Sequence, residues 1–104
     1  MASSMGDTKM AGYVIAQIKV NAPEAYSEYV KQNSQTVEKY RGHFLVRGGE
    51  MEVLEGEYPY PRAVVIEFPS VEAACEWYNS PEYEGPKSIR LATAETNFVL
   101  VEGA

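Results

Sequence analysis

Hydrophobic residues in this sequence change their spacing along the chain, from every second residue to every third or fourth and back again. Residues 13–20 alternate between apolar and other side chains and are rich in β-branched residues, which indicates a strand. Asn21 and Pro23 are typical of a helix start, and apolar and aromatic residues then recur at helical spacing until Gly42. This switch of period constrains the fold to a mixture of strands and helices.

The middle of the chain returns to strand-like spacing. Residues 43–47 alternate, Gly48 and Gly49 interrupt the pattern, and residues 51–56 resume an extended character, so we predict one long, kinked second strand. After a proline-rich loop, residues 62–68 form a third strand, which ends before Pro69.

A second helix is predicted to follow the cap residue Ser70. Its apolar stripe consists of Val71, Ala74, Cys75 and Tyr78, which have the spacing of one helix face. We therefore expect Cys75 to pack in the core as a small hydrophobic residue, since nothing near it in the sequence would make it a thiolate.

The last third of the chain predicts one more short helix and a closing strand. Ser80 and Pro81 have the features of a helix start, but Gly85 and Pro86 should break or kink that helix after one turn. Residues 97–101, with the sequence NFVLV, indicate the fourth and closing strand.

The resulting order, βαββαβ, is that of a ferredoxin-like α+β fold, in which a four-stranded antiparallel sheet carries its helices on one face. With 104 residues the chain has the length of one domain. We assign residues 11–104 to that domain and residues 1–10 to a disordered tail or a remnant of an expression sequence.

Such a sheet leaves one apolar face without helices. That face would carry Tyr13, Ile15, Leu45 and Val65, too much apolar surface for a monomer to expose. The simplest cover is a second copy of the chain, which gives a homodimer with its sheets face to face. Alternatively, the loop between the second and third strands, or the third helix, folds over the face within one chain.

Polar residues alternate with these apolar ones and are therefore expected on the same face. They are Gln17, His43, Arg47 and Glu67, and we expect Glu67 to lie near Gln17 or near Arg47. Convergent polar groups in an apolar cavity are typical of a small-molecule site, to which Tyr13 would contribute. The alternatives are that Arg47 and Glu67 form a purely structural ion pair, and that His43 is a half-exposed residue at a strand end.

Two aromatic residues, Trp77 and Tyr83, occupy the junction of the last two helices, where a pocket mouth could open and bind substrate. Most aromatic residues at helical spacing are core residues, and this is the alternative for both.

Composition excludes several classes of function. The only aspartate is Asp7 and the only histidine is His43, so neither a Ser-His-Asp triad nor a His-rich metal site can be assembled, and we expect no metal or cofactor. The net charge of −6 disfavours nucleic acid and anionic membranes as partners. The single cysteine and the lack of a long apolar segment predict a cytoplasmic protein.

Several motifs, in order, resemble the domain-of-unknown-function family DUF1330 of the dimeric α+β barrel superfamily. They are FLVRGG at 44–49, EVLEG at 52–56, VVIEFPS at 64–70, WYNSPEY at 77–83 and LVEG at 100–103. The resemblance runs from Gly12 to Gly103 and implies a ferredoxin-like subunit and a face-to-face homodimer, but no agreed reaction.

The residues that match the family pattern are Arg47, Gly48, Gly49, Glu67 and Phe68, together with its recurring aromatic and arginine positions at Tyr26, Tyr29, Trp77, Tyr83 and Arg90. His43 is not part of the pattern. Gly85 and Pro86 depart from the helix-forming residues that the family has there, which agrees with the break or kink expected in the third helix.

Two main functions remain open. The first is a cofactor-independent enzyme that performs proton transfer or oxygenation on a small phenolic or carbonyl compound. Glu67, or less readily His43, would take a proton while Arg47 stabilises the enolate or phenolate. The second is a noncatalytic small-molecule-binding or stress-related module with a structural Arg47–Glu67 pair. A structural role in a larger assembly is a third option.

Overall fold

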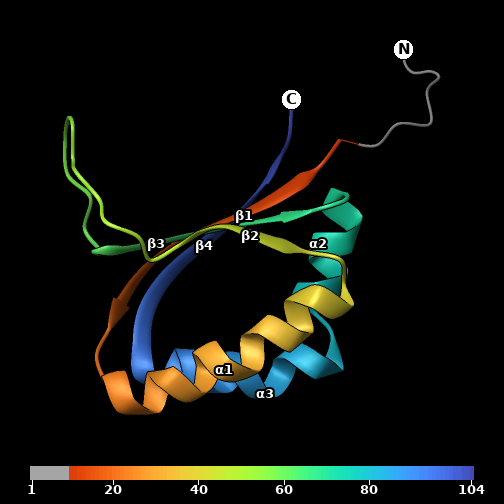
Figure 1. Ribbon diagram of the computed structural model, residues 1–104, viewed down its shortest axis with the longest axis horizontal. Helices are drawn as coiled ribbons and strands as arrows, with labels where there is room; N and C mark the ends of the chain where they lie inside the picture. Colours follow the sequence, from red (N-terminus) through yellow and green to blue (C-terminus); the bar gives the residue numbers. More distant parts are fainter. Residues whose placement is uncertain (1–9) are drawn as a thin grey trace.

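The computed structural model describes residues 10–104, so the predicted tail at residues 1–10 falls almost entirely outside the described part. Four strands form one antiparallel sheet in the order β2-β3-β1-β4, and the three helices lie on one face of it (Figure 1). This is the ferredoxin-like α+β arrangement that the sequence predicts. The elements are β1 (Gly12–Val20), α1 (Pro23–Lys39), β2 (His43–Arg47), β3 (Arg62–Phe68), α2 (Val71–Tyr78), α3 (Pro81–Thr93) and β4 (Ala94–Glu102).

The core lies between the helices and the inner face of the sheet. Alternate residues of the two central strands, β1 and β3, point into it, as their spacing predicts. The helices contribute aromatic residues, of which Trp77 and Tyr83 are fully buried, with ring centroids 4.2 Å apart. The inward residues of the central strands are Val14, Ala16, Ile18, Val64, Ile66 and Phe68.

A β-bulge in β2 changes which residues of that strand face the helices. Phe44 pairs with Ile66, but Val46 pairs with Val65, so Leu45 is an extra residue between them. Since paired residues share a face, Val46 lies on the outer face and Arg47, opposite Val64, lies on the helix face. The strict alternation expected for residues 43–47 is therefore wrong after the bulge, because one extra residue reverses the faces of all that follow.

The predicted continuation of the second strand over residues 51–56 is also wrong. Residues 48–61 form an irregular arm that projects beyond the sheet (Figure 1). Gly48 and Gly56 have positive φ angles of 74° and 78°, which turn the chain away from an extended path. Because β3 begins only at Arg62, the arm has no strand opposite it with which to pair.

Helix α3 continues through the expected break and ends at Thr93. The hydroxyl of Ser80 caps it by accepting from the backbone N–H of Tyr83 at 3.2 Å. Pro86 removes one helical donor, but Gly85 before it lacks the Cβ that would clash with the proline ring. Burial of Pro86 in the helix layer offsets the lost hydrogen bond, so the helix is not broken.

The orientation of α2 differs from its predicted stripe. Ser70 caps the helix as expected, with its hydroxyl accepting from the N–H of Ala73 at 3.1 Å. The buried face consists of Ala73, Ala74 and Trp77, however, and Cys75 is exposed. The bulk of Trp77 sets the rotation of this short helix, which turns Cys75 out of the core. No helix of residues 10–104 is long and apolar enough to cross a membrane.

Candidate functional site

The sheet face opposite the helices is open in this structure (Figure 1). One apolar residue from each strand forms a row across it, in which Val46 pairs with Val65, Val65 with Ile15, and Ile15 with Val99. Ile15 is 38% exposed although it lies on a central strand, and Val99 is 54% exposed. Neither the arm nor α3 covers this row, so the alternative of an intramolecular cover is wrong.

The next row on the same face is polar and contains three of the predicted site residues. Tyr13 pairs with Glu67, and Glu67 pairs with His43 on β2. The phenol of Tyr13 donates a hydrogen bond of 3.0 Å to Oε2 of Glu67. This bond, followed by the negative charge of the carboxylate, raises the pKa of Tyr13 above its ordinary value of 10.0.

A pocket of about 200 Å³ adjoins this polar row, where β2 and β3 meet the end of α1. Its chemically active side chains are Glu67, His43 and Arg41; Ala11, Phe68 and Pro69 complete the lining. Arg41 has a φ angle of 65°, a left-handed conformation that costs a non-glycine residue about 1 kcal/mol. The tight turn between α1 and β2 imposes this conformation and places Arg41 at the pocket.

The sequence patterns do not single out Arg41, and its position directly before the helix-ending Gly42 is the only local signal that points to it. The pocket thus combines a carboxylate, an imidazole and a guanidinium, with a phenol bound to the carboxylate. These groups can accept a proton and stabilise the negative charge that results. Among residues 10–104, no three His, Cys, Asp or Glu side chains come together so as to hold a metal ion.

Two other predicted site residues do not lie where they were expected. Gln17 pairs with Ala63 and Asn97, four residues along β1 from Tyr13, or about 13 Å away. Arg47 is on the helix face, where its Nη2 donates to the carbonyl of Val30 at 2.9 Å. The expected proximity of Glu67 to Gln17 or Arg47 is therefore wrong. Arg47 and Glu67 do not form a structural ion pair, because the bulge places Arg47 on the opposite face of the sheet from Glu67.

Trp77 and Tyr83 lie in the core and not at a pocket mouth. The indole N–H of Trp77 donates to Oγ1 of Thr36 at 3.0 Å. The hydroxyls of Tyr83 and Tyr29 share a hydrogen bond of 2.9 Å, and burial raises the pKa of both phenols. Their positions are those of the core alternative.

A four-stranded antiparallel sheet with helices on one face and an open, apolar opposite face defines this chain as a ferredoxin-like α+β protein. Its sequence matches the family "Domain of unknown function (DUF1330)" over residues 11–104, and the chain belongs to that family. No curated protein matches it at a significant level.

Solved structures share the fold at low sequence identity. A protein of unknown function from Rhodopseudomonas palustris has a TM-score of 0.76 and 18% identity, over 97% of this chain and 88% of that chain. A dimeric ferredoxin-like protein of unknown function from Jannaschia sp. CCS1 has a TM-score of 0.71 and 16% identity, over 88% of this chain and 98% of that one. SnoaB, a cofactor-independent oxygenase from Streptomyces nogalater, has a TM-score of 0.60 and 11% identity, over 91% and 94%. At these identities the likeness concerns the fold.

Proposed function

We propose that two copies of this chain pair their open sheet faces to form a homodimer. The support is the apolar row across all four strands, centred on Ile15 and exposed in the single chain. Burying apolar surface of this kind is the main driving force of protein association. Proteins of the same fold from Jannaschia and Thermobifida fusca are described as dimeric, which supports a dimer as such.

We further propose that the pocket beside Glu67 catalyses proton transfer on a small phenolic or carbonyl compound without a cofactor. The observation that carries the proposal is the position of Glu67 at a pocket of about 200 Å³. Glu67 accepts a hydrogen bond from the phenol of Tyr13, and it pairs across the sheet with His43, which lines the same pocket. The likeness in fold to a cofactor-independent oxygenase is consistent with chemistry that needs no bound cofactor.

In the proposed reaction, Glu67 removes a proton from the carbon next to a carbonyl group. Tyr13 occupies Oε2 of the carboxylate, so Oε1 is the oxygen that takes the proton. The C–H electron pair moves into the enolate, whose oxygen the guanidinium of Arg41 stabilises. Glu67 or His43 then returns a proton to the oxygen or the carbon, so the net reaction is a tautomerisation with no oxidant or reductant. Arg41 takes the role that the sequence assigned to Arg47.

Solvent deuterium exchange at the α-carbon of small aryl ketones and diketones, followed by proton NMR, tests this reaction directly. We expect the protein to accelerate exchange and the substitution Glu67→Gln to abolish the acceleration. Glu76→Gln is the matched control, because Glu76 is an exposed carboxylate on α2 and the change in charge is the same. The proposal fails if the Glu67 variant exchanges as fast as this control, or if no compound exchanges faster than in buffer.

Tyr13→Phe provides a second readout of the same site. It removes the hydrogen bond to Glu67 while leaving the ring, so the pH dependence of exchange should shift and the dimer should persist. A variant with the pH profile of the parent protein would show that Tyr13 takes no part in the reaction.

A further inference from the structure

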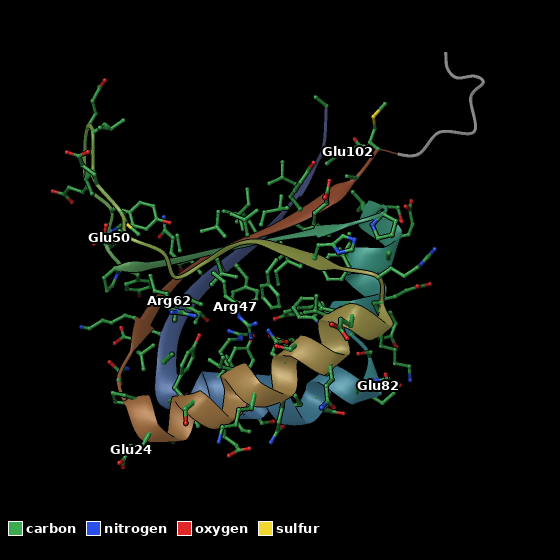
Figure 2. The ribbon with its side chains drawn as sticks, in the orientation of Figure 1. Glu24, Arg47, Glu50, Arg62, Glu82 and Glu102 are labelled. Atoms are coloured by element: carbon green, nitrogen blue, oxygen red, sulfur yellow. The ribbon has the colours of Figure 1, made fainter. Side chains whose placement is uncertain are left out.

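Three arginines from three different elements meet in the layer between the sheet and the helices. Arg47 ends β2, Arg62 begins β3 and Arg90 lies in α3; we call them the arginine cluster. Figure 2 shows Arg47 and Arg62 reaching from the sheet toward α1. Arg47 and Arg62 line one small cavity together with Phe98 of β4. Arg90 packs its guanidinium on the ring of the same Phe98.

Arg90 is a buried cation with neutral partners. It is 2% exposed, its Nε donates to the hydroxyl of Tyr83 at 3.2 Å, and its Nη1 donates to Oγ1 of Thr96 at 2.5 Å. Its guanidinium carbon lies 4.0 Å from the centre of the Phe98 ring. Removing a charge from water without a counterion is costly, so hydroxyls and an aromatic face compensate it only in part.

Arg62 carries the clearest sign of a missing partner. Its Nε is buried and makes no hydrogen bond within residues 10–104. Gly48 is what permits this position, because a Cβ on Gly48 would lie 2.0 Å from Nη1 of Arg62. Gly48 therefore leaves the space that the guanidinium of Arg62 occupies beside the helix layer.

Carboxylates do not neutralise the cluster. Within residues 10–104, the ion pairs join Lys19 to Glu95 and Lys39 to Glu82, and none involves an arginine. Tyr26 lies among the three guanidinium groups: burial raises the pKa of its phenol, and the charges of Arg62, Arg90 and Arg47 oppose that rise. The phenol of Tyr26 is therefore uncharged at neutral pH, and it does not offset the positive charge of the three arginines.

A small cavity of about 10 Å³ lies beside the cluster and is lined by Arg47, Arg62, Tyr26, Tyr29 and Asn33, with apolar residues around them. This volume holds one group about the size of a water molecule. Arg47 is exposed and can move aside from the carbonyl of Val30 to admit a ligand. The two oxygens of a carboxylate match the planar fork of N–H donors on a guanidinium, and the carboxylate would occupy the space that Arg47 vacates.

We propose that the arginine cluster is an anion site that binds the carboxylate group of a small organic molecule or a free carboxylate ion. One carboxylate oxygen would accept from Nε of Arg62, and the negative charge would compensate Arg90. This site lies on the helix side of the sheet and is separate from the pocket beside Glu67, so neither proposal depends on the other.

Calorimetric and NMR titrations at constant ionic strength test the site with formate, acetate, benzoate, chloride and sulfate. We expect carboxylates to bind and to shift the Nε–H resonance of Arg62, which gains an acceptor. Binding of formate without benzoate would identify a free ion as the ligand, and binding of both would identify the carboxylate of a larger molecule. The proposal is overturned if chloride binds as tightly as the carboxylates, or if no carboxylate binds at up to about 100 mM.

Substitutions locate the binding. Arg62→Met should weaken carboxylate binding about tenfold or more, because a charge-assisted hydrogen bond is lost. Lys31→Met removes the same charge from the exposed side of α1 and should leave the affinity within about twofold. Since Arg62→Met could fail to fold, Arg47→Met, at an exposed position, is the second variant. Equal affinities in a folded cluster variant and the Lys31 control would refute the assignment.

Discussion

A substitution at Ile15 is expected to weaken the proposed dimer most. It lies on β1 at the centre of the apolar row, with Val65 on one side and Val99 on the other. Replacing it with lysine introduces a charge where the two sheets would meet. Because Ile15 is 38% exposed in the single chain, the folded subunit can direct a lysine to solvent, and only the dimer must bury it.

Two contributions per subunit determine how much free energy of dimerisation the Ile15→Lys substitution removes. Complete burial of an isoleucine side chain is worth about 1.5–3 kcal/mol, and the partner covers the remaining 38%, so about 0.6–1.1 kcal/mol is lost with the side chain. Burying an ammonium group costs several kcal/mol more. Counted twice, the sum exceeds about 5 kcal/mol, which weakens dimerisation by at least about 1,000-fold. Ile15→Ala loses only the first contribution, and its effect should be about tenfold.

Sedimentation velocity across a dilution series measures this difference. We expect the parent chain to sediment as a dimer at micromolar concentration, Ile15→Ala to dissociate slightly earlier, and Ile15→Lys to remain a folded monomer by circular dichroism. Leu91→Lys is the matched control, since Leu91 is a 62% exposed leucine on α3. The reasoning is refuted if the parent chain is a monomer, or if Ile15→Lys sediments like the Leu91 control.

Three further predictions concern the subunit itself. The hydrogen bond from Lys39 lowers the pKa of Glu82 to about 2, so the carboxylate stabilises the fold above its ordinary pKa of 4.5 and loses this effect as the pH falls toward 2. The melting temperature of Glu82→Gln should therefore lie below that of the parent chain at pH 7, and the two should converge near pH 2. Trp77→Phe removes a hydrogen bond and core volume, and urea unfolding should show a loss of about 2–3 kcal/mol. The exposed Cys75 should react fully with a thiol reagent in the native protein, whereas a thiol that reacts only in denaturant would contradict its position.

The fold could be predicted because its central strands obey a local pattern. Residues of β1 and β3 alternate without interruption, and both strands have a neighbour on each side, so nothing shifts their register. The hydroxyl caps at Ser70 and Ser80 also act within three residues and are visible in the sequence. Local patterns of this kind predict the order and type of the main elements.

The candidate site could be predicted only in part, because side-chain direction depends on distant contacts. Glu67 and Tyr13 lie on a regular ladder, and their proximity follows from alternation and topology. The bulge at Leu45 could not be predicted from residues 43–47, because Phe44, Leu45 and Val46 are all apolar and fit the sheet in either register. Only the pairing with β3, where the N–H of Gly48 donates to the carbonyl of Ala63 at 2.8 Å, reveals the shift.

That one extra residue links the two surfaces for which we propose functions. By reversing the faces of β2, the bulge places Val46 in the apolar row of the open face and Arg47 in the arginine cluster. Without it, Arg47 would enter the dimer face as an unpaired charge, and Val46 would replace a guanidinium in the helix layer. The extra residue that makes the open face apolar enough to associate therefore also adds the exposed Arg47 to the arginine cluster on the helix side of the sheet. A shift of register, and not a change of composition, separates the two roles.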